Sequence, residues 1–347
     1  MFTCPTCGSP DCVKPMAEIL AESSSLYVPC STCVADQPLD KMAPFRGLGI
    51  TAGPDAGRCP ACGRRHLDIV MAQVLDLLID SGLKPGNAAL KDVGTPLVAL
   101  GVDLIDPPRL GKKDVVLVLD EIDRKTAEYV LAKVPEIKGV IRRHGGPGKS
   151  VGLPDTGEEP HLYDLLAGCD VRGDVLNSLV GDFCFYRRQS VMHVEYWRNN
   201  SVKIKVLEKM FLQGDLAGKT VVDGMASAGT LGLMAAAAGA EKVILNDAWL
   251  PAVESILLNI EANRELLGVG LERLRSLSGL PVIGGEPELI ARASGSVELE
   301  VYHGDVRKLA GVVKSCDVCI IDPFPGMPSD DFVRHWQGIT KDRVVTL

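Results

Sequence analysis

The chain has 347 residues, a length typical of two or three domains, and its 46% hydrophobic and 24% charged residues exclude an intrinsically disordered chain. No apolar run reaches the roughly 18 to 20 residues of a membrane helix, and Met1–Cys4 do not begin a secretory signal, so we expect a cytoplasmic protein with no membrane contact. The net charge of −8 excludes a uniformly basic nucleic-acid-binding surface but leaves room for a local basic patch.

Seven of the eleven cysteines lie in the first 62 residues. They include three C-x-x-C pairs: Cys4 and Cys7, Cys30 and Cys33, and Cys59 and Cys62. The first and third pairs share the sequence C-P-x-C-G, a turn that directs two thiolates toward one point and suits tetrahedral zinc. Cys12 and His66 bring the candidate ligands to eight, which is enough for two four-ligand sites or for one site with spare thiols. The pairing stays open.

The alternatives to structural zinc are weaker. A reducing cytoplasm disfavours disulfides, no βαβ pattern surrounds a pair as redox chemistry would require, and an iron–sulfur cluster remains a further possibility. Apolar residues at three- and four-residue steps predict a helix over His66–Ser81. We therefore expect residues 1–82 to form a Cys-rich zinc-binding module that this helix closes.

The middle of the chain is expected to hold an irregular linker and a small α+β domain. Residues 83–111 carry several Pro and Gly residues and predict the linker. Residues 112–212 predict the domain. We expect strands over Asp114–Leu119, Ile137–Arg142 and Gly181–Tyr186, helices over Arg124–Lys133 and Glu195–Leu212, and a helical turn over Leu162–Leu166.

Residues 213–347 predict a Rossmann-like α/β domain. A strand over Thr220–Asp223 leads through small residues into a helix over Leu231–Ala238, and a second strand over Lys242–Leu245 ends in Asn246 and Asp247. An acid at that second position can accept hydrogen bonds from both hydroxyls of a ribose. An NAD site is the competing interpretation, but Ala226 and Ala228 replace the first glycines of G-x-G-x-x-G.

The rest of this domain repeats the pattern of a strand that ends in an acid. After a helix over Pro251–Asn263 and a long loop over Gly279–Gly295, strands over Val297–Tyr302 and Cys316–Ile321 end near Asp305 and Asp322. Together with Asp223 and Asp247, these acids are expected along one edge of a sheet. A last strand over Arg343–Leu347 predicts a domain that is reduced at its C-terminus.

Four motifs carry a family resemblance: V-V-D-G-M-A-S-A-G-T at 221–230, I-L-N-D at 244–247, H-G-D-V at 303–306 and D-P-F-P at 322–325. The series resembles class I S-adenosylmethionine-dependent methyltransferases, and it is most similar to the tRNA guanosine methyltransferases of archaea and eukaryotes. Residues 114–263 resemble more loosely the tRNA guanosine N1-methyltransferase and wybutosine-synthesis family. The resemblance implies S-adenosylmethionine as cofactor and methyl transfer to a nitrogen of a guanosine in tRNA or another RNA.

The same resemblance implies the site residues. Those that line the cofactor are Asp223, Gly224, Ala226, Gly229, Asn246, Asp247 and Asp305, the last against adenine. The catalytic residues are Asp322, Pro323 and Phe324. D-P-F-P is nearer to the D-P-F-G loop of tRNA guanosine N2-dimethyltransferases than to the N1 family's N-P-P or N-L-P, and Gly152–Thr156 stands where the N1 family has a G-x-x-R arginine. An exocyclic amine is therefore the expected acceptor, with Phe324 stacked on its base.

An RNA partner rests on local charge. Two basic stretches with interleaved aromatic residues predict the contact surface. They comprise Lys133, Lys138, Arg142, Arg143 and Lys149, then Arg187, Arg188, Arg198, Lys203, Lys205 and Lys209, with Tyr186, Tyr196 and Trp197 among them. A solvated helix face and turn explain these two stretches equally well. A methyltransferase for a protein side chain or a small metabolite, and a non-catalytic cofactor- or RNA-binding protein, remain alternatives.

Overall fold

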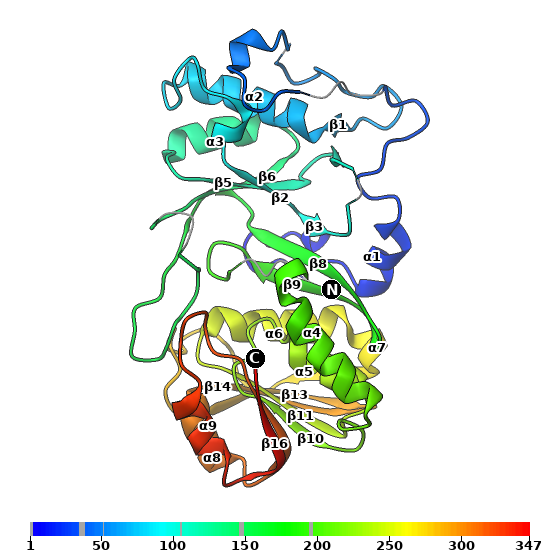
Figure 1. Ribbon diagram of the computed structural model, residues 1–347, viewed down its shortest axis with the longest axis vertical. Coiled ribbons are helices and arrows are strands. Elements are labelled where there is room, and N and C mark those ends of the chain that lie inside the picture. Colours follow the sequence, from blue (N-terminus) through cyan, green and yellow to red (C-terminus); the bar gives the residue numbers. More distant parts are fainter. Residues whose placement is uncertain (1–2, 35–38, 51, 105, 146–148, 194–196) are drawn as a thin grey trace.

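The computed structural model describes residues 3–34, 39–50, 52–104, 106–145, 149–193 and 197–347, the last range without the side chains of 197–201. Three layers follow one another along the long axis (Figure 1). They are built on a four-stranded sheet, a three-stranded sheet and a seven-stranded sheet, and a two-stranded ribbon adds to the first. None of the described helices is long and apolar enough to cross a membrane.

The seven-stranded sheet has the order β12-β13-β14-β11-β10-β15-β16. Its parallel part comprises β10 (Thr220–Asp223), β11 (Lys242–Asp247), β14 (Glu298–His303), β15 (Cys316–Ile321) and β16 (Thr340–Thr346). The chain thus starts in the middle, moves outward to β14 and returns to the other side of β10, which is the doubly wound order. The predicted Rossmann-like α/β class is confirmed, as is the strand at the C-terminal end.

Alternating side chains along these strands reach two separate cores. Val221 and Val243 belong to a cluster on one face of the sheet, while their neighbours Val222 and Ile244 belong to a cluster on the other. The first face packs against α4 (Trp197–Leu212), α5 (Thr230–Ala237), α6 (Leu250–Ala262) and the short α7 (Arg264–Leu267). The second packs against α8 (Val306–Val312) and α9 (Asp330–Trp336). A strand buried on both faces therefore explains the continuous apolar runs of the sequence.

The expectation of a loop over 279–295 is wrong for residues 288–295. The structure has an antiparallel hairpin there, in which β12 (Val269–Arg273) pairs with β13 (Glu288–Gly295), and β13 pairs with β14. The many Gly and Pro residues between 279 and 287 form only the turn region. Pairing with β14, rather than local propensity, makes 288–295 a strand.

The four-stranded sheet has the order β2-β5-β6-β7. It comprises β2 (Thr95–Val98), β5 (Val115–Leu119), β6 (Ile137–Arg142) and β7 (Asp164–Gly168), with α3 (Arg124–Lys133) joining β5 to β6. Strands β5 and β6 and helix α3 confirm the predicted elements. The predicted helical turn over Leu162–Leu166 is wrong, because this segment pairs with β6 as the edge strand β7.

The segment 83–111 is not the irregular linker that we expected. It contributes β2, β3 (Leu100–Gly101) and β4 (Arg109–Leu110) to three different sheets. These strands have two to four residues, too few to show a period in sequence. β2 and β3 pair with the longer strands β5 and β8, while β4 pairs with the equally short β1, so all three depend on partners distant in the chain.

The N-terminal part divides between two layers. Helix α2 (Leu67–Asp80) confirms the predicted closing helix and shares an apolar core with β5, β6 and α3, while β1 (Arg65–His66) pairs with β4. Buried Arg65 forms an ion pair with buried Glu136 beside β6. In contrast, α1 (Met16–Ser23) lies against β8 (Val171–Ser178) and β9 (Gly181–Arg188) of the three-stranded sheet (Figure 1).

Two asparagines join the three-stranded sheet to α6. Asn259 and Asn263 each donate to, and accept from, the backbone of β9 at Tyr186 and Cys184, at 2.7 to 2.9 Å. Both side chains are fully buried, so these bonds replace the missing strand neighbour of β9. The three-stranded sheet is therefore held firmly to the helix layer of the large sheet.

Candidate functional site

A pocket of about 810 Å³, part of it open to solvent, lies at the carboxyl ends of β10, β11, β14 and β15. This is the edge at which open α/β sheets bind ligands. Its lining includes the predicted residues Gly224, Asn246, Asp247, Asp305, Asp322, Pro323 and Phe324. The rest of the lining includes residues 151–156, residues 191–193 and Lys203 of α4.

Asp223 lies below the pocket rather than in its lining. Its side chain is fully buried, and Oδ2 accepts a hydrogen bond of 2.8 Å from the Gly232 N–H in the first turn of α5. A β-carbon at Gly232 would lie 3.1 Å from that oxygen and 2.7 Å from Leu245, so only glycine permits this approach. Asp223 thus occupies the helix N-terminus at which a dinucleotide-binding fold holds a pyrophosphate.

We expect Asp223→Ala to lower the free energy of unfolding by about 2 kcal/mol, because the Gly232 N–H loses a charged acceptor in the interior. Thermal and urea denaturation of the purified protein measure the loss. Asp223→Asn retains one acceptor oxygen and should lose less. Equal stability of Asp223→Ala and the unsubstituted protein would contradict this role.

The turn after β10 is shaped for close contact with a ligand. Gly224 leaves no room for a side chain, since a β-carbon would lie 2.5 Å from Val306, and Ser227 adopts a left-handed conformation with φ of 51°. The Ser227 N–H donates to Asp247 Oδ2 at 2.8 Å. Ala226 and Gly229, both predicted to line the cofactor, lie in this turn but outside the pocket lining.

Asp247 and Asn246 present acceptors at the end of β11. Asp247 accepts from the Ser227 and Trp249 N–H groups, and burial raises the pKa of its carboxyl although these two bonds lower it. Asn246 is fully buried and donates to the carbonyls of Gly224 and Gly304. Its Oδ1 accepts no hydrogen bond from the described residues. A buried acceptor of this kind in a pocket wall fits a ligand that donates.

Asp305 is bonded to the loop between β6 and β7 of the four-stranded sheet. Burial raises its pKa, but the Arg307 side chain and backbone and the Thr156 hydroxyl, at 2.8 to 2.9 Å, lower it on balance. Arg307 also binds Asp155 at 2.6 Å. The loop between β6 and β7 therefore reaches the large sheet (Figure 1). Sequence reasoning noted Gly152–Thr156 only for the arginine it lacks and missed Asp155 and Thr156 as parts of the site.

Asp322 and Phe324 follow β15 and face α4 and the loop. Lys203 Nζ donates to Asp322 Oδ2 at 2.6 Å, which makes Lys203 a site residue and removes it from the predicted RNA surface. The Phe324 ring lies edge-to-face with His193 at 5.9 Å between centroids and close to Gly152, where a β-carbon would approach the ring to 3.0 Å. The catalytic residues expected from sequence thus lie together with two basic side chains that were not assigned to them.

Only some residues of the two basic stretches lie exposed at the surface, where we expected all of them. Lys138 and Arg187 are buried, and Arg142, Arg143 and Arg188 form ion pairs with nearby acids. Tyr186 is buried as well. Tyr196 and the side chains of Trp197 and Arg198 lie outside the described residues. Lys205 and Lys209 remain exposed on α4, the helix that also supplies Lys203 to the pocket.

Far from the pocket, four predicted metal ligands come together. The sulfurs of Cys30, Cys33, Cys59 and Cys62 lie within 4.8 Å of one another, with three separations of 3.7 Å. Backbone N–H groups of Cys62 and Ala61 lower the pKa of Cys59 to about 6, whereas desolvation raises the pKa of Cys33 to about 12. The candidate His66 is not part of this group, because its Nδ1 accepts the Asp68 N–H at the start of α2.

Cys4, Cys7 and Cys12 gather elsewhere, around Cys169 of the middle layer. The sequence prediction did not include Cys169, which follows β7 and has no cysteine close to it in the chain. Eight cysteines therefore form two groups of four among the described residues. This resolves the pairing that the sequence left open.

No protein-family model matches this chain, and no curated protein sequence does. The chain is similar in structure to TYW2 from Pyrococcus horikoshii in complex with MeSAdo, at 15% identity and a TM-score of 0.41 over 79% of this chain and 76% of that one. It is similar to the M. jannaschii tRNA m1G37 methyltransferase at 15% identity and a TM-score of 0.39, over 80% of this chain and 63% of that one. It is similar to Trm1 from Pyrococcus horikoshii with S-adenosyl-L-methionine at 20% identity and a TM-score of 0.36, over 49% of this chain and 40% of that one.

The chain thus covers less than two thirds of the last two structures. At these identities and TM-scores, the neighbours transfer no residue roles to this chain.

Proposed function

We propose that the chain is an S-adenosylmethionine-dependent methyltransferase that acts on a nitrogen of a guanosine in tRNA or another RNA. The observation that carries this proposal is the position of Asp247, Asp305 and Asp322 at the ends of three parallel strands around one pocket. The family motifs of the sequence supply these same three acids. The two lines of support are independent, because motif spacing does not depend on how the strands pair.

The pocket fits the cofactor in shape and charge. Asp247 is placed to accept from the two ribose hydroxyls, and the free Oδ1 of Asn246 and the bare backbone of Gly224 suit close contact. The pocket lining has four aspartates, Asp155, Asp247, Asp305 and Asp322, and one lysine, Lys203, which suits a cationic ligand. Asp223, at the end of β10, accepts a hydrogen bond from the first turn of α5. Its carboxylate would repel a pyrophosphate there, so the site favours this cofactor over NAD.

When bound, S-adenosylmethionine supplies a methyl group on a positively charged sulfur. The chain must then hold an acceptor nitrogen in line with that methyl group and take up one proton. Asp322 Oδ2 is fixed by Lys203, which keeps the carboxylate oriented toward the pocket as an acceptor for amino hydrogens. Phe324 offers an apolar ring on which a planar base can stack.

RNA is the acceptor class that this geometry favours. Pro323, Phe324 and the 151–156 loop line the pocket, and α4 presents exposed Lys205 and Lys209 from the same helix as Lys203. A ring on which a base can stack, and exposed lysines on the helix that supplies Lys203, are features of sites that bind unpaired nucleotides. Zinc held by Cys30, Cys33, Cys59 and Cys62 would fix the N-terminal module as a structural ion.

The test is incubation of the purified chain with methyl-labelled S-adenosylmethionine and fractionated cell extract. We expect label in the RNA fraction, and nucleoside analysis should find it on guanosine. Label in protein or small molecules instead would overturn the RNA acceptor but not the activity. Failure of calorimetry to detect binding of S-adenosylmethionine would overturn the methyltransferase itself.

A further inference from the structure

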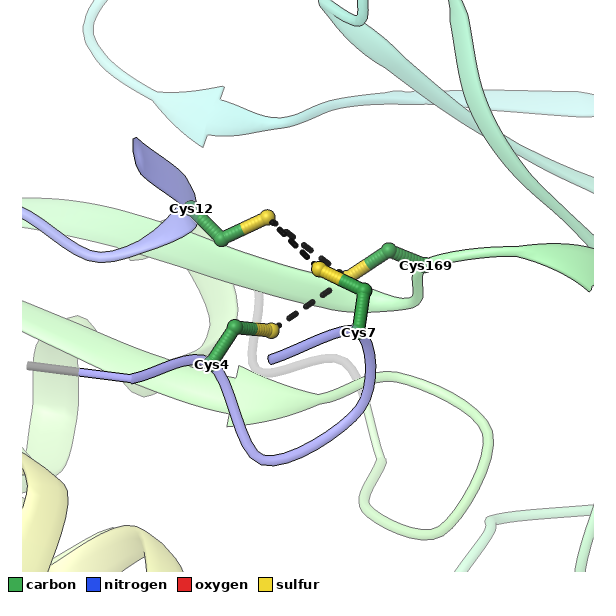
Figure 2. A group of neighbouring side chains, drawn as sticks. All are labelled: Cys4, Cys7, Cys12 and Cys169. Carbon is green, nitrogen blue, oxygen red and sulfur yellow. Dashed lines mark hydrogen bonds between the residues drawn. The ribbon is translucent and has the colours of Figure 1, made fainter. Parts of the chain in front are cut away.

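The second group of cysteines joins two distant parts of the chain. Cys4, Cys7 and Cys12 precede α1, whereas Cys169 lies between β7 and β8 (Figure 2). All four sulfurs lie within 4.8 Å of one another. We propose that these four thiolates bind one zinc ion, which clamps the N-terminal segment onto the three-stranded sheet.

The sulfur positions fit a single tetrahedral ion. Zinc bound to four sulfurs at about 2.3 Å places neighbouring sulfurs about 3.8 Å apart. The structure has separations of 3.5 Å from Cys4 to Cys169, 3.8 Å from Cys12 to Cys169 and 3.2 Å from Cys7 to Cys12. Such short separations leave no room for a cluster of iron and sulfide between the ligands.

The backbone around Cys4 repeats that of the other cysteine group. The Gly8 N–H donates to the Cys4 carbonyl at 2.9 Å and the Cys4 N–H to the Ser9 carbonyl, as Gly63 and Cys59 do at the second C-P-x-C-G turn. Gly8 and Gly63 also share a left-handed conformation, with φ of 69° and 70°. Two copies of one turn, each with a second pair of sulfurs at hand, indicate the same ligand chemistry.

The backbone of Cys169 is fixed by close contacts with Lys138 and Gly139 of β6. Its N–H donates to the Lys138 carbonyl at 2.9 Å, and a β-carbon at Gly139 would lie 2.2 Å from its carbonyl oxygen. Buried Lys138 donates through Nζ to the Val171 carbonyl, two residues after Cys169, at 2.6 Å. Four thiolates around Zn²⁺ carry a net negative charge, which this ammonium group offsets in a poorly solvated place.

Other contacts bring the N-terminal segment to the same place. Thr6 donates to buried Asp170 at 2.7 Å, and the Tyr186 hydroxyl of β9 bonds to both the N–H and the carbonyl of Lys14. Met16 and Ile19 of α1 add an apolar contact with β8 and β9. The proposed zinc site joins residues that are 165 positions apart in the chain. The sheet that it holds includes β9, which is hydrogen-bonded to α6, and the first turn of α6 borders the pocket. This zinc site therefore supports the layer that closes the pocket.

The test is the zinc content of the full chain, purified under reducing conditions, by mass spectrometry. We expect two zinc ions per chain, and one for Cys169→Ala. The matched control is Cys184→Ala, a buried cysteine of the same apolar cluster outside the four-sulfur group, which should retain two. Cys7 is exposed, so Cys7→Ala tests the site without a change in the core and should also retain one.

Hydrogen exchange supplies the second measurement. The amides of residues 4–20 should exchange faster in Cys7→Ala than in the unsubstituted chain, while those of α2 should not change. One zinc ion in the unsubstituted chain, two in both variants, or iron in place of zinc would overturn the proposal. These measurements need no methyl acceptor, so their failure and that of the proposed enzyme are distinguishable.

Discussion

Replacement of Asp322 by asparagine is expected to lower kcat for methyl transfer by about a hundredfold or more, while S-adenosylmethionine still binds. Under the proposed function, this carboxylate accepts hydrogen bonds from the acceptor's amino group and receives its proton, and an amide performs neither role well. Steady-state methyl transfer to the labelled RNA measures kcat, and calorimetry measures cofactor affinity.

The control for this prediction is Asp330→Asn, an exposed acid at the start of α9. It should have unchanged kcat. Lys203→Met tests the ion pair separately, because Asp322 then remains but loses the ammonium group that orients it. Full activity of Asp322→Asn would show that methyl transfer does not need this carboxylate.

Loss of the Asp247 carboxylate is expected to weaken binding of S-adenosylmethionine about a hundredfold. Two hydrogen bonds from ribose hydroxyls to a charged acceptor contribute about 1.5 kcal/mol each, and their combined loss corresponds to that factor. Calorimetry on Asp247→Ala measures it. Glu298→Gln is the matched control, since Glu298 is an exposed acid at the opposite end of the same sheet.

The pH dependence gives this prediction a second readout. Since burial raises the pKa of Asp247, its carboxylate is protonated at a higher pH than an ordinary aspartate. Cofactor affinity should therefore fall as the pH is lowered through that raised pKa, and Asp247→Asn should remove this fall. Unchanged affinity in Asp247→Ala, with thermal denaturation showing an intact fold, would place the cofactor elsewhere.

Local patterns in the sequence were sufficient for the elements that form the large sheet. Strands β10, β11, β14 and β15 each end at or near an acid, and helix α6 shows apolar residues at three- and four-residue steps. The strand over Cys316–Ile321 and the helix over Arg124–Lys133 agree with the structure residue for residue. The acids at the strand ends were identifiable for the same reason, because parallel strands bring their carboxyl ends to one edge.

Sequence reasoning failed where a segment owes its structure to a distant partner. Strand β13 lies in a stretch rich in Gly and Pro, and β2, β3 and β4 are too short to show a period. The basic residues were misread for a related reason. Charge in the sequence does not reveal that Arg187 is buried against Asp174 or that Lys203 faces Asp322.

By itself, the sequence determined the α/β class, the C-x-x-C pairs and the acids of the site, because each depends on spacing along a few neighbouring residues. Only the tertiary structure decided how eight cysteines divide into two groups, since Cys169 reaches Cys4 across 165 residues. It also brought Asp155, Thr156 and Lys203 to the pocket. Such contacts arise from the packing of separate layers, and packing leaves no periodic signal in the chain.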